Sequence, residues 1–168
     1  MSPIESGFLI FKNVLNEAYL RSKNFKIMKN SGSCLCGKVK FLVNKDIQTM
    51  YHCHCSLCRK QSGTGANSAT LVNEKLFEWV SDTESIGTFK KDTGFTSCFC
   101  MSCGSPVPNK VGNSSFIWIP LGLLNEVPAI KKRLGFCLTS KINWSPVVEL
   151  DKEYLELPSW NELEDYFD

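Results

Sequence analysis

The sequence predicts a mainly β protein built from short antiparallel strands. Five segments are rich in β-branched and aromatic residues: "GKVKFLV" at 37–43, "ATLV" at 69–72, "FEWV" at 77–80, "IGTF" at 86–89 and "SFIWI" at 115–119. Gly, Asn, Asp or Pro residues lie between them, as in sheets joined by tight turns. The second distinctive feature is a set of nine cysteines, most of them clustered at short spacings. The 168 residues suffice for one domain with a hydrophobic core.

The domain is expected to span 31–168 and to follow an extension of 30 residues that is partly helical. Within the extension, apolar residues recur at the spacing of one helix face: Phe8, Phe11, Leu15 and Ala18. No secretory signal is predicted, because the longest apolar run there, 8–11, is too short. No segment approaches the roughly 20 apolar residues that span a bilayer, so we expect no membrane partner.

Helix is predicted to be scarce beyond residue 30. A single turn is expected after "HCSLCRKQSG" at 54–63, and "WNELEDYF" at 160–167 is a candidate C-terminal helix. The 19 Lys and Arg residues exceed the 17 Asp and Glu residues by two. So small an excess gives no reason to expect nucleic acid as a partner.

The cysteine spacings favour a metal over a disulfide framework. An odd number of cysteines cannot pair completely within one chain, and C-x-C and C-x-x-C spacings are typical of metal sites. A reducing, cytoplasmic location is therefore expected. A bare C-x-C occurs once, and C-x-C-x-x-C occurs twice: Cys34 and Cys36; Cys53, Cys55 and Cys58; Cys98, Cys100 and Cys103. Cys137 stands apart and is predicted to be a buried apolar residue.

The geometry of these motifs indicates zinc. Residues i and i+2 of a strand point to the same face, so the two sulfurs of a C-x-C can converge on one ion. The two sulfurs of a C-x-x-C converge at a turn, and a structural zinc site takes four such ligands in a tetrahedron. Because eight clustered thiols are too many for one ion, we expect two.

Spacing alone leaves the pairing open. Cys34 and Cys36 could join Cys100 and Cys103, or they could join Cys55 and Cys58. In the first arrangement the triplet that begins at Cys53 lacks a fourth ligand. Three residues could supply one: Cys98, His52 or His54. We expect His54 to face away from the metal and His52 to share the face of the cysteines. Cys98 is expected to be a packed strand residue.

The motifs resemble those of a known family. "GSCLCGKVKF", "CHCSLCRKQSG", "CFCMSCGSPV" and "SKINW" occur in this order. They look like the signature of the glutathione-dependent formaldehyde-activating enzyme family, which also contains centromere protein V. The resemblance runs from about Ser31 to about Pro158, and three cysteine motifs with matching neighbours make it specific. Cys98 and the N-terminal extension lie outside this pattern.

The resemblance implies zinc-clipped sheets similar to the Mss-four-like fold, with two zinc ions as cofactors. It implies a closed structural site formed by four thiols: Cys34, Cys36, Cys100 and Cys103. It also implies a catalytic zinc held by Cys53, Cys55 and Cys58, with an open fourth position. The implied reaction, classed with the carbon–sulfur lyases, is condensation of glutathione with formaldehyde to S-(hydroxymethyl)glutathione. Two alternatives are a zinc-dependent lyase acting on another thiol conjugate and a non-catalytic, zinc-stabilised binding module.

Several residues are candidates for binding glutathione. Arg59 and Lys60 follow Cys58 directly and could meet its carboxylates, for which Arg is the better bidentate donor. The donors of "QSGTG" at 61–65 could line a substrate pocket. Lys141 and Trp144 match the C-terminal motif, and Trp144 is expected in the core or in a pocket wall.

Overall fold

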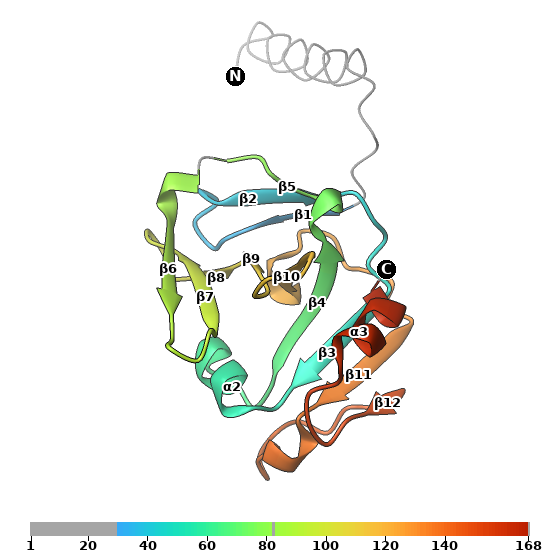
Figure 1. The fold of residues 1–168 in the computed structure, drawn as a ribbon. Coiled ribbons are helices and arrows are strands. Elements are labelled where there is room, and N and C mark those ends of the chain that lie inside the picture. The colour runs from blue at the N-terminus through green and yellow to red at the C-terminus, as the bar shows by residue number, and fades with distance from the viewer. Residues whose placement is uncertain (1–29, 82, 168) are drawn as a thin grey trace, which may run out of the picture.

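The computed structural model describes residues 30–81 and 83–167, which form three sheets (Figure 1). The first sheet has the order β1-β2-β5, with β1 (Asn30–Ser33), β2 (Lys40–Val43) and β5 (Phe77–Trp79). The largest has the order β12-β11-β3-β4-β10-β9, with β12 (Lys152–Glu153), β11 (Lys132–Phe136), β3 (Thr49–Cys53), β4 (Asn67–Asn73), β10 (Phe116–Pro120) and β9 (Asn109–Lys110). The third has the order β6-β7-β8, with β6 (Ile86–Lys90), β7 (Thr96–Cys100) and β8 (Pro106–Val107).

The predicted mainly β fold is confirmed, and each of the five predicted segments overlaps a strand. The named strands pair antiparallel, as expected, with two exceptions in the largest sheet: β11 runs parallel to both β3 and β12. A parallel pair needs a long connection, and here most of the domain lies between β3 and β11. The β3–β11 register places Phe136 opposite Cys53.

Two α-helices belong to the described residues, α2 (Ser56–Ser62) and α3 (Trp160–Phe167). A turn was expected after 54–63, whereas α2 lies within that stretch. Cys55 caps the N-terminus of this helix, and Gly63, in the left-handed conformation, ends it. The predicted C-terminal helix is confirmed as α3. Short 3-10 segments occur at η1 (Glu74–Leu76), η2 (Thr83–Ser85), η3 (Leu121–Leu123) and η4 (Leu138–Ser140). The helix predicted in the N-terminal extension lies outside the described residues.

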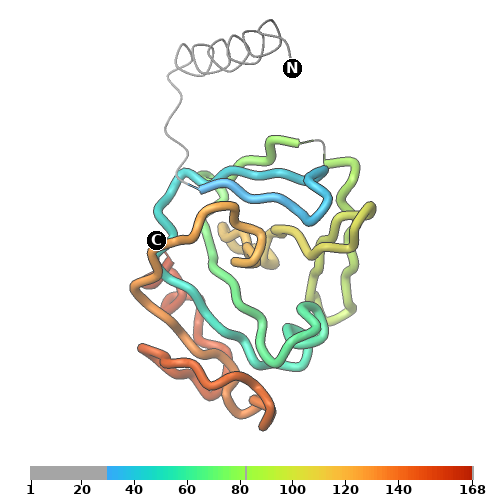
Figure 2. The backbone as a smooth tube through the Cα atoms, turned by 180° about the vertical axis from the view of Figure 1, so that it is seen from behind, coloured from blue at the N-terminus to red at the C-terminus, as the bar shows by residue number. Residues whose placement is uncertain are grey.

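The core is divided into three apolar clusters, and two of them contain cysteines. One cluster joins the buried faces of β3, β4, β10 and β11 to α3, and it includes Cys53 and Cys137. Another is small and includes Cys34 and Cys100. Figures 1 and 2 show the turn after β1 beside the end of β7, and the Leu35 amide donates to the Ser105 hydroxyl there at 3.1 Å. The motifs that contain Cys34 and Cys100 therefore lie where the first and third sheets meet.

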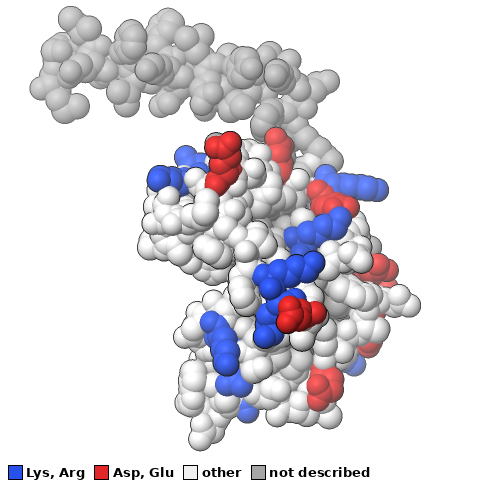
Figure 3. Space-filling model, turned by 60° about the vertical axis from the view of Figure 1, so that its left-hand side comes forward, with Lys and Arg blue, Asp and Glu red and all other residues white. Residues whose placement is uncertain are grey.

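The surface carries charges of both signs. On the face shown in Figure 3, Lys and Arg side chains are interspersed with Asp and Glu. Among residues 30–81 and 83–167, no helix is both long and apolar enough to cross a membrane.

Candidate metal centres

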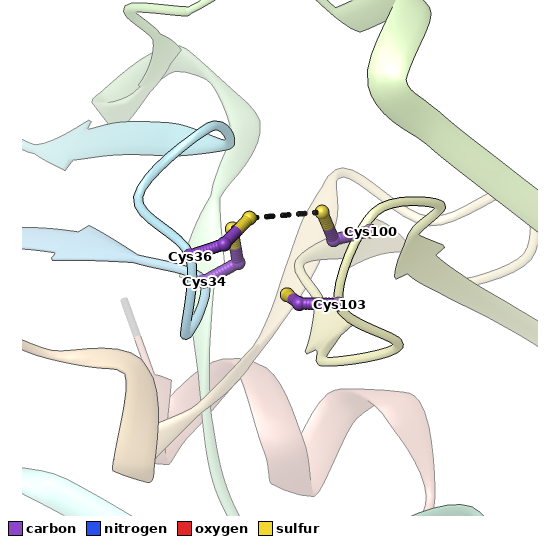
Figure 4. A group of neighbouring side chains, drawn as sticks. All are labelled: Cys34, Cys36, Cys100 and Cys103. Carbon is purple, nitrogen blue, oxygen red and sulfur yellow. Dashed lines mark hydrogen bonds between the residues drawn. The ribbon is translucent and has the colours of Figure 1, made fainter.

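Four thiols from two distant segments meet between the first and third sheets (Figure 4). Cys34 and Cys36 lie in the turn after β1, Cys100 ends β7, and Cys103 lies in the turn that follows. The Cys36 sulfur lies 3.5 Å from that of Cys34 and 3.8 Å from that of Cys100. All four sulfurs lie within 4.8 Å of one another.

Both turns in this group have the same local design. The Gly37 amide donates to the Cys34 carbonyl at 2.9 Å, and the Gly104 amide donates to the Cys100 carbonyl at 2.8 Å. Both glycines have positive φ, 75° and 73°, a conformation that residues with a Cβ rarely adopt. Each turn folds back tightly enough to bring two sulfurs to one side.

The four-thiol group fits zinc well. Zn–S bonds near ~2.3 Å in a tetrahedron place sulfurs about 3.8 Å apart, close to the separations found here. The backbone amide of Val39 donates to the Cys34 sulfur at 3.3 Å. Hydrogen bonds from Ser105 lower the pKa of the Cys103 thiol to about 5. Both contacts favour the thiolate form that zinc binds.

Three further thiols gather where β3 passes into α2. Cys53 ends the strand, Cys55 caps the helix and Cys58 lies in its first turn, so one short segment supplies the whole group. Their sulfurs lie within 4.8 Å of one another, and no fourth His, Cys, Asp or Glu joins them among the described residues. The cysteine spacing left two pairings open. The fold places Cys34 and Cys36 with Cys100 and Cys103 instead of with Cys55 and Cys58.

The three-thiol group favours negative charge on one sulfur. Hydrogen bonds from the thiols of Cys53 and Cys58 lower the pKa of Cys55. The backbone amide of Cys58 also donates to the Cys55 sulfur, at 3.4 Å. The pKa of Cys53 is raised, chiefly by its hydrogen bonds to the other two thiols and by burial. Three converging thiols with one readily ionised member form a suitable donor set for zinc.

A cavity of about 370 Å³ lies beside the three-thiol group, and all three of its cysteines line it. Cys137 lines it too, immediately after β11. Cys137 is 8% exposed, which confirms the predicted burial, but the sequence did not place it near the triplet. The parallel pairing of β3 with β11 brings it there. Among the described residues, Cys137 is also the one residue other than glycine whose φ is positive, at 56°.

The comparison with protein families agrees with these centres. A family model described as "Glutathione-dependent formaldehyde-activating enzyme" matches residues 29–139, about two thirds of the chain. The chain belongs to this family. A crystal structure of a Rhodobacter sphaeroides protein matches with 22% sequence identity and a TM-score of 0.49, over 58% of this chain and 89% of that one. The family match contains all three clustered cysteine motifs and ends just before "SKINW" at 140–144.

Cys98, the thiol outside the family pattern, belongs to neither sulfur group. It lies on β7, half-buried against the apolar cluster that contains Cys34 and Cys100. Its sulfur lies 3.4 Å from the Thr88 hydroxyl on β6. Its position agrees with that of a packed strand residue.

The two histidines lie away from the cysteines. The prediction that His52 shares the face of the cysteines is wrong, because side chains alternate along β3 and His52 lies on the opposite face to Cys53. His52 and His54 line a separate cavity of about 460 Å³. The Nδ1 atom of His52 lies 2.9 Å from the Ser68 hydroxyl, and that of His54 lies 3.5 Å from the Ser145 hydroxyl.

The candidate substrate residues are dispersed. Arg59 donates from Nε to the His54 carbonyl at 3.0 Å, and Lys60 is exposed on α2; neither lines the cavity at the three thiols. From "QSGTG" at 61–65, Gln61 lines that cavity, whereas Thr64 and Gly65 line the one at the histidines.

The two C-terminal candidates lie on the surface. Lys141 is exposed, and Trp144 is 67% exposed, so the expectation that this tryptophan lies in the core or in a pocket wall is wrong. The segment that carries it, after η4, forms no strand or helix that would bring the indole against the sheet.

Proposed function

We propose that the protein is a zinc-dependent enzyme of the carbon–sulfur lyase type that condenses glutathione with formaldehyde to S-(hydroxymethyl)glutathione. The observation that carries this proposal is the contrast between the two sulfur groups. One offers four thiols and is complete, whereas the other offers three and lies beside a cavity large enough for a substrate. The description of the family supports the choice of substrates.

Two zinc ions are proposed. Cys34, Cys36, Cys100 and Cys103 would hold one ion in a closed structural site, and Cys53, Cys55 and Cys58 would hold the other. When bound at the three thiols, zinc would lower the pKa of a substrate thiol that enters its open position. Free glutathione is mostly protonated at neutral pH, because thiol pKa values lie near ~8.5.

The proposed reaction needs no oxidant. The glutathione sulfur attacks the carbonyl carbon of formaldehyde and a C–S bond forms. The electron pair of the C=O π bond passes to oxygen, which takes up the proton that the thiol gave up. Formaldehyde is reactive by itself, so holding the two reactants together is the main contribution asked of the protein.

Arg59 and Lys60 are proposed to attract glutathione. Three thiolates around Zn²⁺ carry a net charge of about −1, which repels the carboxylates of glutathione. The two cations follow Cys58 directly on α2 and would offset this charge. The clustered thiols must stay reduced to serve as ligands, which supports a cytoplasmic location. We propose no nucleic-acid or membrane partner.

The test combines three measurements on the purified protein: zinc per chain, glutathione binding by calorimetry, and formation of S-(hydroxymethyl)glutathione by NMR against the spontaneous rate. We expect two zinc ions, measurable binding and a rate above background. Cys55→Ser should lose one zinc and the activity while the protein stays folded. Cys98→Ser is the matched control, since it removes a thiol from neither group. Two zinc ions without glutathione binding would contradict the proposal.

A further inference from the structure

The cavity beside the three thiols has walls that are mainly apolar. Apart from the cysteines, its lining consists largely of aromatic and aliphatic side chains from α2, α3, the largest sheet and adjoining loops, among them Tyr51, Leu71, Trp118, Phe136, Leu157 and Trp160. An apolar cavity of roughly 150 Å³ binds benzene. At about 370 Å³, this one has room for an aromatic ring or a branched alkyl group.

Charged groups are scarce in this lining. Among the described residues that form it, Lys110 is the one with a charged side chain, and its Nζ already pairs with Glu74 at 2.7 Å. The amide of Gln61 is occupied as well, since its Nε2 donates to Ser97 and its Oε1 accepts from Asn67. Burying a carboxylate or an ammonium without partners is costly. The cavity therefore suits the peptide part of glutathione poorly, and formaldehyde leaves it nearly empty.

One polar atom in the lining lacks a partner. Asn109 is 9% exposed, and its Nδ2 donates to the Lys110 carbonyl at 3.1 Å. Its Oδ1 is fully buried and has no hydrogen-bond partner in the part of the chain that the structure describes. Because protein covers Oδ1 on all sides, a ligand in the cavity does not reach it, and Asn109 adds no polar recognition to the apolar walls.

We propose that this cavity binds the apolar group of an aldehyde larger than formaldehyde, placed beside the three-thiol group as the aldehyde is converted to its thiol adduct. This inference rests on the proposed function and changes the electrophile. The thiol sulfur adds to the carbonyl carbon, the π electrons pass to oxygen, and the oxygen gains the proton of the thiol. The adduct then carries a hydroxyl group. The charged part of the thiol stays outside the apolar walls.

Stable thioethers of glutathione test the cavity apart from turnover. With the zinc-loaded protein, the probes are S-benzylglutathione and S-methylglutathione, followed by calorimetry and by the fluorescence of Trp118 and Trp160. Burying a phenyl ring should make the benzyl compound bind about tenfold more tightly, or better. Equal affinities would overturn the inference while leaving the proposed function standing.

A matched pair of variants locates the binding. Leu157 lines the cavity and is 64% exposed, whereas Leu155, two residues earlier and 68% exposed, does not line it. Leu157→Glu should abolish the preference for the benzyl compound, and Leu155→Glu should keep it. Both variants should retain the zinc content of the wild type. If both leave the preference intact, the phenyl group binds elsewhere and the assignment to this cavity fails.

Turnover tests the aldehyde itself. Glutathione with phenylacetaldehyde should give a larger enzymatic excess over the spontaneous rate than glutathione with formaldehyde. Benzyl mercaptan, which has the ring but no peptide, separates the two proposals. Its binding without any binding of glutathione compounds would support the cavity and contradict the use of glutathione.

Discussion

The two sulfur groups differ in how much of the chain they hold together. The four-thiol group joins segments far apart in sequence, since Cys36 and Cys100 are separated by 64 residues. The three-thiol group comes from one stretch of six residues, 53–58, at the junction of β3 and α2. A metal that bridges distant segments removes much of the chain entropy of the unfolded state. A metal bound within one short segment contributes little to the stability of the fold in this way, so such a site can serve a reaction instead.

The surroundings of the groups differ in the same sense. Two of the four thiols, Cys34 and Cys100, are buried in a small apolar cluster, and none of the four lines the cavity at the three thiols or the cavity at the histidines. All members of the three-thiol group line a cavity with room for a ligand. The two sulfur groups therefore differ together in three properties: the number of ligands, the separation of the segments in sequence, and access to a cavity.

The largest expected effect is the loss of the fold on breaking the four-thiol group. Cys36→Ser removes a ligand from the bridge between the first and third sheets. Structural zinc contributes on the order of 10 kcal/mol to folding, so we expect aggregation or a Tm lowered by about 10 °C or more. Zinc per chain should fall from two to one, as measured by atomic absorption together with thermal unfolding.

Cys55→Ser is the matched comparison, because it also replaces one partly accessible cysteine by serine. Its Tm should stay within a few degrees of the wild type. Equal damage from the two substitutions would break the division into a structural and a catalytic group.

The next largest effect is expected on chelation, which should release zinc from the two sulfur groups at different rates. A site with three protein ligands and access to a cavity exchanges its metal more easily than a closed tetrahedral site. On addition of EDTA we expect the zinc at the three thiols to leave before the zinc at the four thiols. Release can be followed with a chromogenic chelator while circular dichroism follows the fold. The first ion should leave without loss of β structure, and simultaneous release of both would show that the groups are equivalent.

Local sequence was sufficient to predict most of the fold and the grouping of the thiols into motifs. Segments such as 69–72 and 115–119 form strands because β-branched and aromatic residues pack well on a pleated, half-buried surface. The motif that begins at Cys53 is local, so its spacing nearly specifies its geometry. The choice of partner for Cys34 came from the resemblance to the family, since spacing left it open.

Features that depend on distant pairing were not predictable. Nothing near Cys137 in the sequence signals that β11 lies parallel to β3, which places this thiol at the cavity. The exposure of Trp144 has the same origin, because burial of an isolated aromatic residue depends on which element packs over it. The error on His52 is different in kind. Counting alternate residues along β3 from Cys53 would have placed it on the opposite face.

A smaller effect is expected at the contact that anchors β1, the strand leading into Cys34. The carboxylate of Glu126 accepts from the Ser31 amide at 2.8 Å and from its hydroxyl at 3.0 Å. These hydrogen bonds lower the pKa of the Glu126 carboxyl, and the one from the Ser31 amide has the largest effect. A lowered pKa in the folded state adds stability above the pKa of the unfolded state, and this contribution is lost as the pH falls through the folded value.

Glu126→Gln should therefore lower Tm slightly at pH 7, by on the order of 1 °C for so exposed a group, and should narrow its difference from wild type below about pH 4. Thermal unfolding between pH 3 and 7 measures this, with Glu78→Gln on β5 as the control. A difference that grows in acid would contradict the assigned sign.

The smallest effect is expected at Cys98. Cys98 precedes Cys100 by two residues on β7, and its sulfur lies 3.4 Å from the Thr88 hydroxyl on β6. Sulfurs that share a zinc ion lie about 3.8 Å apart, and the Cys98 sulfur belongs to neither group of sulfurs that lie within 4.8 Å of one another. Cys98→Ser should keep two zinc ions per chain and the activity, with Tm lowered by less than about 1 °C. Loss of either ion would mean that this thiol is a ligand. If only the ion at the three thiols were lost, Cys98 would be its fourth ligand, and the open position that the proposed chemistry needs would not exist.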